Sequence, residues 1–286
     1  MILETQRATG ASMRQICRTL DVPRSTFYQA AAPTVSHLGD CDMSERIARI
    51  FHHHRQRYGY RRIGQELRDA AIVCAPARVR RLMKARDLRA VTPRRFTPRT
   101  SDGRADKPSP NLLENQPMPT GPNQVWTGDI TYIPTAGGWL YLAVVLDLYS
   151  RKIVGWSLAP HMRASLVVDA LRQAIGSRTR GPTATTIFHS DRGCQYSSTA
   201  FRQLLAHSRI TPSMSARANP YHNAWTESFI GSLKTEMLRD GSFLCETDAK
   251  FEIFEYIEMY YNNQRKHSSL RYQTPAQFEQ TVVLQN

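Results

Sequence analysis

The stretch VWTGDITYI at residues 125–133 decides the fold of the second half of the chain. It is rich in β-branched and aromatic residues and predicts a strand, and two similar runs follow after short turns: LYLAVVLDL at 140–148 and KIVGWSLA at 152–159. Three successive strands with short connections form an antiparallel meander. Asp129 lies inside the first strand, where both strand propensity and burial disfavour a carboxylate, so we expect it to have a functional reason.

Alternating helices and strands follow this meander. The residue pattern predicts helices near 164–176 and 198–207, strands at 185–191 and around 211–215, and a further helix at 223–238. A chain that begins with successive strands and continues with alternating helices and strands is typical of a mixed sheet covered by helices. The sequence therefore predicts an α/β fold with a mixed five-stranded sheet flanked by helices.

The last of these helices carries two charged residues at the edge of an apolar face. Residues 223–238 read NAWTESFIGSLKTEML, and helical spacing gathers five apolar side chains on one side: Trp225, Phe229, Ile230, Leu233 and Met237. Glu227 and Lys234 lie at the rim of that face, two turns apart. For an arbitrary glutamate, a solvated helix face is the commoner explanation. Whether Glu227 is such a residue or has a function must be decided from the rest of the chain.

Three carboxylates occupy particular places in the predicted fold. Asp129 is in the first strand, Asp191 ends the fourth strand, and Glu227 is on the later helix. If the first and fourth strands are neighbours, the two aspartates converge at one end of the sheet and the helix delivers the glutamate. Such carboxylates repel one another and raise each other's pKa unless cations fill the site. Mg²⁺ is the natural occupant, because it prefers oxygen ligands, and paired ions about 4 Å apart support in-line phosphoryl displacement.

The charge of the chain is unevenly distributed. The net charge is +14, and residues 1–110 hold 22 Lys and Arg against 10 Asp and Glu, a balance of +12. Residues 111–286 hold 16 against 14, a balance of +2. An excess of this size favours a polyanionic partner through counterion release. A structural RNA binder has the same charge, so this feature alone does not name a function.

Residues 11–31, ASMRQICRTLDVPRSTFYQAA, have the spacing of a helix-turn-helix, with a break at 21–23 and a second helical start after it. In such a unit the second helix enters the major groove of DNA. That arrangement places four residues near DNA: Arg24, Ser25, Thr26 and Tyr28. A plain helical hairpin is the alternative, because the motif is short and its turn lacks glycine.

A second helical block, at 44–90, is rich in arginine. Its stretch YGYRRI at 58–63 combines aromatic residues with Arg61 and Arg62, which suits contact with phosphates, although a solvated basic face explains single residues equally well. The triplet His52–His53–His54 does not suggest a metal site, because adjacent residues of a helix point in different directions.

These patterns divide the chain into four segments. They are a helix-turn-helix segment at 1–40, a basic helical DNA-binding domain at 41–92, a proline-rich linker at 93–122, and a catalytic core with a C-terminal helical region at 123–286. Five cysteines without a CxxC pair indicate neither a disulfide framework nor a zinc knuckle. No segment has the pattern of a signal peptide, and the longest apolar run, 139–149, is too short to span a bilayer, so we expect a cytoplasmic protein with no membrane partner.

The spacing of the acids resembles a known signature. Thirty-five residues separate Asp191 from Glu227, and Lys234 follows seven positions later, as in the DDE signature of retroviral integrases and bacterial insertion-sequence transposases. Five stretches are similar to the integrase-core transposases called OrfB products: WTGDITYI, LDLYSRKIVGW, HSDRGCQY, NAWTESFIGSLKTE and YYNNQRKHSSLRYQTP. The resemblance extends over about residues 44–280 and includes the helical block before the core.

The resemblance implies a ribonuclease H-like fold and a DNA transposase. It implies two divalent ions on Asp129, Asp191 and Glu227, Mg²⁺ or in its place Mn²⁺, which serve cleavage of element ends and strand transfer. It assigns Lys234 to DNA near the active site. The expected partners are double-stranded DNA of element ends and target, further copies of the chain in the DNA complex, and an upstream reading-frame product joined by frameshifting. The expected location is the bacterial cytoplasm, at the nucleoid when DNA is bound.

Some residues depart from the pattern or stay open. His222 stands where this family often has an acid, and the zinc-binding His and Cys residues of retroviral integrases are absent. We favour a structural role for Asp147 over metal binding, because the strand reversal after it should carry it away from the metal site. Four polar residues near the C-terminus fit DNA contact and helix packing almost equally: Tyr261, Asn262, Arg265 and His267.

Two other function classes share parts of this description. A DNA-binding regulator that occupies element ends without catalysis would keep the basic helices, and loss of any one acid would have favoured it, but all three acids are present. A general nuclease would share the fold and the metals. Their products separate the two enzymes, because a transposase joins strands and a nuclease leaves only hydrolysed fragments.

Overall fold

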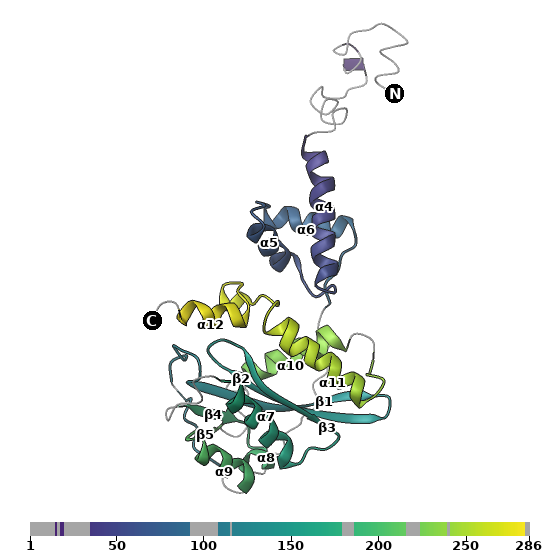
Figure 1. Cartoon of the computed structure of the whole chain (residues 1–286). Coiled ribbons are helices and arrows are strands. Elements are labelled where there is room, and N and C mark those ends of the chain that lie inside the picture. Colours follow the sequence, from purple (N-terminus) through teal and green to yellow (C-terminus); the bar gives the residue numbers. More distant parts are fainter. Residues whose placement is uncertain are drawn as a thin grey trace. The chain divides into compact units, whose positions relative to one another are not determined.

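The structure of the chain is a computed structural model, and it describes residues 15, 18, 19, 35–91, 108–114, 116–178, 186–215, 224–238 and 241–283. It divides into two compact units, Met1–Ala90 and Val91–Asn286 (Figure 1). The predicted recognition residues Arg24, Ser25, Thr26 and Tyr28 lie outside the described residues. No helix among the described ranges is long and apolar enough to cross a membrane.

Residues 35–90 of the first unit contain three helices, in agreement with the prediction of a helical block. They are α4 (Val35–His53), α5 (Tyr60–Asp69) and α6 (Pro76–Ala85). Apolar residues at helical spacing form its core: Ile47, Phe51, Ile63, Leu67, Val79, Leu82 and Met83. Arg78 and Arg81 of α6 both donate to the Asp40 carboxylate of α4 at 2.6 Å, which ties the two helices together.

The histidine triplet at the end of α4 does not gather on one point. His52 and His53 are exposed, whereas His54 is buried and stacks on the Tyr58 ring with 3.7 Å between centroids. The His53 and His54 rings meet edge to face, with 5.0 Å between centroids.

A five-stranded mixed sheet forms the centre of the second unit, as the sequence predicted. Its strands are β1 (Val125–Thr135), β2 (Gly138–Asp147), β3 (Ile153–Ala159), β4 (Ile187–Ser190) and β5 (Thr211–Met214). Their order across the sheet is β3-β2-β1-β4-β5. The first three strands are antiparallel, and β4 and β5 run parallel to β1. An antiparallel meander extended by two parallel strands is the sheet of the predicted ribonuclease H-like fold.

The β1–β2 hairpin is longer than the sequence pattern indicated. The pairing runs from Trp126 opposite Asp147 to Thr135 opposite Gly138, so Pro134 belongs to the strand and not to the turn. Gly138 has φ +129°, which a side chain would strain, and this glycine lets the chain reverse tightly.

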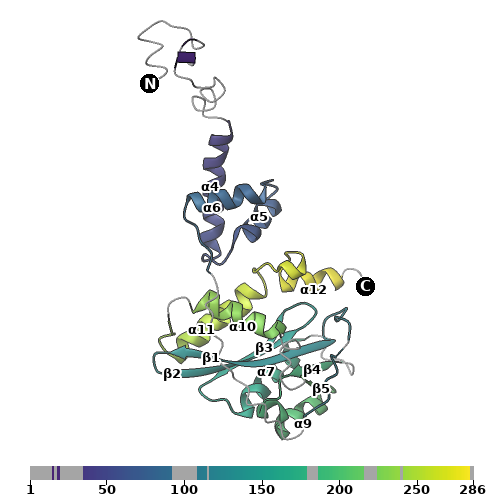
Figure 2. The same cartoon turned by 180° about the vertical axis from the view of Figure 1, so that it is seen from behind.

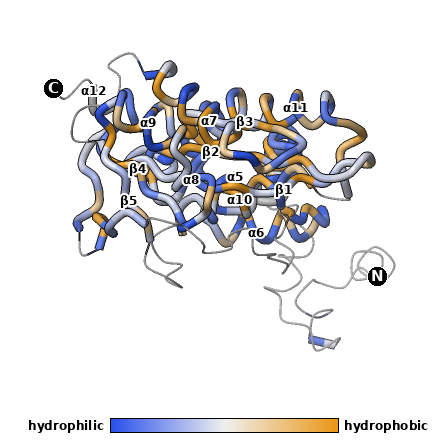
Figure 3. Tube along the Cα trace, turned by 90° about the horizontal axis from the view of Figure 1, so that it is seen from below, coloured by the Kyte–Doolittle hydropathy of each residue, from blue (hydrophilic) through white to orange (hydrophobic). Residues whose placement is uncertain are grey.

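Helices cover both faces of the sheet (Figures 1 and 2). On one face lie α7 (Ala164–Ser177), α8 (Cys194–Ser197) and α9 (Thr199–His207). On the other lie α10 (Ala224–Met237) and α11 (Glu246–Phe254), which both contact β1. The chain continues through a π-helical turn η2 (Glu255–Tyr261), a short η3 (Ser268–Leu270) and α12 (Pro275–Val283). In Figure 3 the apolar residues concentrate in the central strands and in the helices that face them.

The core under α7 is closely packed. A side chain at Gly155 of β3 would meet the Ala170 carbonyl oxygen and, at 2.6 Å, the Ala174 backbone nitrogen. Glycine is therefore required there, because it lets α7 lie directly against the strand. Large side chains fill the rest of this core, among them Trp126, Phe188, Tyr196, Phe201, Leu171 and Met214.

Residues 93–122 were predicted to be a linker, but the part of this range that the structure describes packs against the sheet of the second unit. Leu112 N donates to Ser213 Oγ at 2.9 Å, and Met214 N donates to the Pro110 carbonyl at 3.3 Å, so residues around 110–113 border β5. The four segment boundaries remain a prediction.

Candidate active site

Two neighbouring parallel strands align the two aspartates. Val125 pairs with Ile187 and Thr127 with His189 between β1 and β4. Asp129 lies two residues after Thr127 in β1, and Asp191 directly follows the end of β4, so both lie at the same end of this strand pair. The Asp191 charge acts on Asp129, which agrees with this placement. The expectation that the first and fourth strands are neighbours is confirmed.

Asp129 is mostly enclosed by protein. Its Oδ1 accepts a hydrogen bond from Ile130 N at 2.8 Å. Burial, together with the negative charges of Asp191 and Glu227, raises the pKa of Asp129 to about 8, against the opposing effects of the Ile130 N–H and of Lys234. The preceding Gly128 leaves no room for a side chain, because a Cβ would lie 2.5 Å from the Phe188 ring. The strand therefore packs on the core at the point where it presents the carboxylate.

The loop after β4 holds Asp191. Gly193 N donates to Asp191 Oδ1 at 3.0 Å, and Arg192 Nε donates to the Ser215 carbonyl at 3.0 Å. Tyr196 follows on α8; burial raises its pKa well above the ordinary value, and the charges of Asp129 and Asp191 add to that effect. Tyr196 therefore forms part of the wall behind the two aspartates, a position that no sequence signal indicated.

Helix α10 brings Glu227 to this end of the sheet. Glu227 is exposed in the first turn of the helix, and partial burial raises its pKa. The preceding residue, Thr226, faces the sheet and is fully buried. Its Oγ1 lies 2.7 Å from Thr127 Oγ1 of β1. Glu227 therefore projects from a helix that is hydrogen-bonded to the strand carrying Asp129.

The buried face of α10 differs from the predicted stripe. It consists of Thr226, Phe229, Leu233 and Glu236, whereas Trp225 is 39% exposed and Ile230 and Met237 are half-buried. The predicted stripe was rotated, because two polar residues have buried partners and take positions that a purely apolar pattern assigns to Trp225 and Met237.

Lys234 lies two turns after Glu227 on α10. Its Nζ is 4.2 Å from the centroid of the Tyr132 ring of β1, three residues beyond Asp129. Partial burial lowers the pKa of Lys234, and the Asp129 charge acts in the opposite direction. The Lys234 amine therefore lies within electrostatic reach of Asp129, and its contact with DNA remains a prediction.

The charges of Asp191 and Glu227 act on Asp129, but the three acids do not form a closed ligand set. Within the part of the chain that the structure describes, no three His, Cys, Asp or Glu side chains come together closely enough to hold a metal ion. Both Asp191 and Glu227 raise the pKa of Asp129, so their charges act on it across the site. Mutual repulsion of carboxylates without a cation between them favours such separation. The assignment of Asp129, Asp191 and Glu227 as ligands remains a prediction.

Asp147 has a structural role, as the sequence suggested. It is fully buried at the end of β2. Its Oδ2 accepts from Asn123 N at 2.7 Å and from Arg178 Nη2 at 2.9 Å, and its Oδ1 accepts from Tyr149 N at 3.0 Å. Arg178 also binds Glu279 of α12 at 2.8 Å. These bonds close the strand turn and attach the C-terminal helix.

The polar residues near the C-terminus are packed inside the unit. Asn262 accepts from Ile153 N and donates to Ile153 O, both at 3.0 Å. Arg265 donates to both carboxylate oxygens of the buried Glu236 on α10, at 2.8 and 3.1 Å. Tyr261 and His267 are buried with them. Of the two roles left open by the sequence, the structure supports helix packing.

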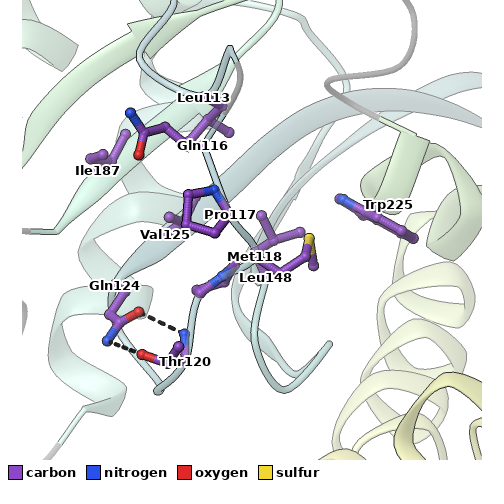
Figure 4. Close-up of a pocket in the computed structure, with 11 residues that line it drawn as sticks. Leu113, Gln116, Pro117, Met118, Thr120, Gln124, Val125, Leu148, Ile187 and Trp225 are labelled. Carbon is purple, nitrogen blue, oxygen red and sulfur yellow. Dashed lines mark hydrogen bonds between the residues drawn. The ribbon is translucent and has the colours of Figure 1, made fainter.

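A cavity of about 500 Å³ lies beside the start of β1 (Figure 4). Its wall includes Trp225, two residues before Glu227, and the chain at 116–120. Thr120 and Gln124 are joined there by two hydrogen bonds, of 2.9 and 3.3 Å. This cavity was not predicted from the sequence, because the proline-rich residues of its wall were interpreted as part of a linker.

The two arginines predicted to contact phosphates lie at the start of α5. Arg61 is exposed and Arg62 half-buried. Their guanidinium carbons are 5.6 Å and 5.5 Å from the ring centroids of Tyr60 and Tyr58. The aromatic rings therefore support both side chains, while DNA contact remains a prediction.

Comparisons with known proteins cover most of the chain. Two models described as "Integrase core domain" match residues 119–220 and 208–275, and one described as "HTH-like domain" matches 40–96. Among solved structures, the chain is similar to part of a simian T-cell lymphotropic virus intasome, with a TM-score of 0.46, 18% identity, and coverage of 72% of this chain and 67% of that one. It is also similar to the HTLV-2 integrase catalytic core domain in complex with magnesium, with a TM-score of 0.44, 20% identity, and coverage of 56% and 98%.

Two curated relatives match nearly their whole length. The transposase for insertion sequence element IS904 of Lactococcus lactis subsp. lactis (strain IL1403) is 43% identical over 237 residues, which are 83% of this chain and 93% of the relative. Transposase InsF for insertion sequence IS3A of Escherichia coli (strain K12) is 38% identical over 274 residues, 94% of each chain. The chain therefore belongs to the family of insertion-sequence transposases with an integrase core domain.

Proposed function

We propose that this transposase cuts DNA at the ends of its insertion sequence and joins the freed strands to target DNA, with Asp129, Asp191 and Glu227 as the catalytic acids. One observation carries the proposal. Asp129 in β1 and Asp191 just after β4 lie at the same end of two adjacent parallel strands, and the helix with Glu227 is hydrogen-bonded to the first of these strands. The curated relatives are transposases by name, which supports the same reaction class.

The acids suit divalent cations. All three offer only carboxylate oxygens, the donors that Mg²⁺ and Mn²⁺ prefer. The raised pKa of Asp129, about 8, shows that this carboxyl is poorly ionised without a nearby positive charge, so a cation would stabilise its charged form. When bound, two Mg²⁺ ions supply activation of the attacking oxygen and stabilisation of the leaving oxygen in an in-line displacement. Mn²⁺ has the same ligand preference and is proposed as a substitute.

Other residues bind and orient the DNA. We propose that Lys234, beside Tyr132 and within the influence of Asp129, holds a backbone phosphate next to the scissile bond. Arg61 and Arg62 on α5 contact phosphates further away, and the helix-turn-helix residues Arg24, Ser25, Thr26 and Tyr28 read the element ends. The balance of +12 within residues 1–110 supports this division of roles.

The proposed reaction also implies partners. Two element ends must be processed and joined together, so we propose that at least two copies of the chain assemble on DNA. Fusion to an upstream reading-frame product by frameshifting, and action at the nucleoid in the bacterial cytoplasm, belong to the same proposal.

The test is substitution of Glu227 by Gln in the full chain, assayed on DNA from the flanks of the element. We expect Glu227→Gln to abolish Mg²⁺-dependent end joining and to leave DNA binding intact. Glu246→Gln is the matched control, because Glu246 is also an exposed glutamate in the first turn of a helix, α11.

Three outcomes would contradict the proposal. If the Glu227→Gln chain still joins ends, the acid assignment is wrong. If the wild-type chain binds element ends without cutting them, it is a DNA-binding regulator. If the wild-type chain yields only hydrolysed fragments, it is a nuclease.

A further inference from the structure

A buried pair of hydroxyl groups links the helix of one proposed acid to the strand of another. Thr127 and Thr226 are both 0% exposed, and their Oγ1 atoms are 2.7 Å apart. Thr226 directly precedes Glu227, and Thr127 lies two residues before Asp129 in β1. The contact is therefore adjacent in sequence to two of the three acids.

The hydroxyl pair is directional, unlike the rest of the buried face near Glu227. Phe229 packs against Tyr261 with 4.7 Å between ring centroids, and Leu233 is buried by apolar contact. Apolar contacts tolerate small rotations of a helix, whereas a buried hydrogen bond has a preferred distance and angle. Breaking it would leave a buried polar group without a partner, which is costly. The Thr127–Thr226 bond therefore restricts both rotation and sliding of this end of α10 on β1.

Small rotations of α10 matter for Glu227. A side-chain end lies about 6 Å from a helix axis, so a rotation of roughly 10° moves it by about 1 Å. A misplacement of about 1 Å can reduce a reaction about 100-fold. Glu227 is exposed in the first turn of α10, so a rotation of the helix carries its carboxylate with it.

The far end of α10 has a separate anchor. Glu236 lies nine residues after Glu227, and Arg265 binds its carboxylate at 2.8 Å. That contact is more than two turns away from Glu227, whereas Thr226 is its neighbour in the chain. Thr226 is thus the buried polar anchor next to the proposed metal ligand.

We propose that the hydrogen bond between Thr127 and Thr226 positions Glu227 for metal binding. This inference rests on the proposed function, because it concerns the same site. Both threonines are positioning residues: they act through the helix and do not touch metal or DNA.

The experiment compares four variants of the full chain in Mn²⁺ binding, measured by titration calorimetry, and in thermal unfolding. Thr226→Val removes the bond, Thr226→Ser keeps a hydroxyl, and the double variant Thr127→Val with Thr226→Val removes both hydroxyls. Thr186→Val is the matched control, because Thr186 is fully buried at the start of β4 and its hydroxyl donates to the Asn123 carbonyl at 2.6 Å.

We expect Thr226→Val to weaken Mn²⁺ binding about tenfold or more, the size of effect seen when groups that orient metal ligands are removed. Thr226→Ser should restore the affinity to within about twofold. The double variant should regain thermal stability relative to Thr226→Val, because no orphan hydroxyl remains, and yet still bind Mn²⁺ weakly. Regained thermal stability together with weak Mn²⁺ binding in the double variant would show that the hydrogen bond acts on metal affinity through the position of Glu227 and not through overall stability. Thr186→Val should lower thermal stability without changing the metal affinity.

Two results overturn this inference alone. One is an Mn²⁺ affinity of Thr226→Val equal to that of the wild type; the other is an equal loss of affinity in Thr186→Val. In both, the wild-type chain binds Mn²⁺ and joins DNA ends, so the proposed function stands. A wild-type chain that binds no Mn²⁺ overturns the inference together with the proposed function.

Discussion

Replacement of Asp129 by Asn should make the metal-free protein more stable, and increasingly so as the pH rises. The pKa of Asp129 is raised by burial from its ordinary value of 3.8 to about 8, so the native state keeps a proton that the unfolded chain releases. Between these two values the unfolded state binds fewer protons than the native state, and the free energy of unfolding therefore falls with rising pH. Asn carries no charge and avoids this loss.

The magnitude follows from the distance between the two pKa values. About four pH units, at about 1.4 kcal/mol each, give an upper limit of about 6 kcal/mol above pH 8. Asp129 as a residue is only partly buried, so we expect roughly half of this limit, about 3 kcal/mol, at pH 8.5. At pH 5 the expected gain is about 1 kcal/mol or less, because pH 5 is only about one unit above the pKa of Asp129 in the unfolded chain. The Asn side chain can still accept the hydrogen bond from Ile130 N.

The assay is urea unfolding of the full chain in EDTA, followed by tryptophan fluorescence. All four tryptophans lie in the second unit, so the signal reports on the fold that carries Asp129. With an m-value of roughly 2–3 kcal/mol/M, the midpoint of Asp129→Asn should rise by about 1 M urea at pH 8.5. Asp169→Asn is the control, because Asp169 is exposed on α7 and surface changes have small effects.

A midpoint difference that stays constant between pH 5 and 8.5 would refute the reasoning, as would a less stable Asp129→Asn chain at high pH. Addition of Mg²⁺ should reduce the difference in urea midpoint between the wild type and Asp129→Asn. A cation beside ionised Asp129 stabilises the folded wild type, whereas the variant has no charge at this position for the cation to bind. Failure of Mg²⁺ to do so would speak against the metal assignment while leaving the titration argument intact.

Three further predictions concern packing and DNA binding. Arg265→Ala should lower the free energy of unfolding by about 3–5 kcal/mol, because the Glu236 carboxylate remains buried and unpaired; a loss below about 1 kcal/mol in chemical denaturation would contradict this. Gly155→Ala should cost about 1–3 kcal/mol or more, since its Cβ would meet the Ala170 carbonyl, and an unchanged melting temperature would show that α7 moves away freely. Arg61→Ala should weaken binding to all DNA sequences alike and reduce the slope of log K against log salt by about 1; an unchanged slope would exclude a phosphate contact.

The central sheet could be predicted because its signals are local. The strands β1 to β3 are runs of β-branched and aromatic residues separated by turns, and short connections leave few ways to arrange them. Asp129 stood out because a carboxylate inside such a run is unfavourable. The neighbourhood of β1 and β4 was a conditional expectation, and the parallel register at Thr127 and His189 supplies what the sequence left open.

The orientation of α10 could not be predicted in this way. Periodicity treats Thr226 and Glu236 as surface residues, because it counts apolar side chains and ignores partners that are distant in the chain. Thr226 is paired with Thr127, 99 positions earlier, and Glu236 with Arg265, 29 positions later. Asn262 likewise accepts a hydrogen bond from the backbone N–H of Ile153, 109 positions earlier. Such contacts require the fold before they can be recognised.

These misread residues share a physical property that bears on function. The helix that carries Glu227 and Lys234 is held at its start by a hydroxyl pair and at its end by a buried ion pair, with apolar residues between. Burying polar groups in this way gives little net stability compared with apolar packing, because desolvation offsets the attraction. Their directionality, however, fixes the rotation of the helix, which apolar contacts leave loose. In the proposed active site, where α10 presents the exposed Glu227 beside Asp129 and Asp191, such contacts contribute orientation more than stability.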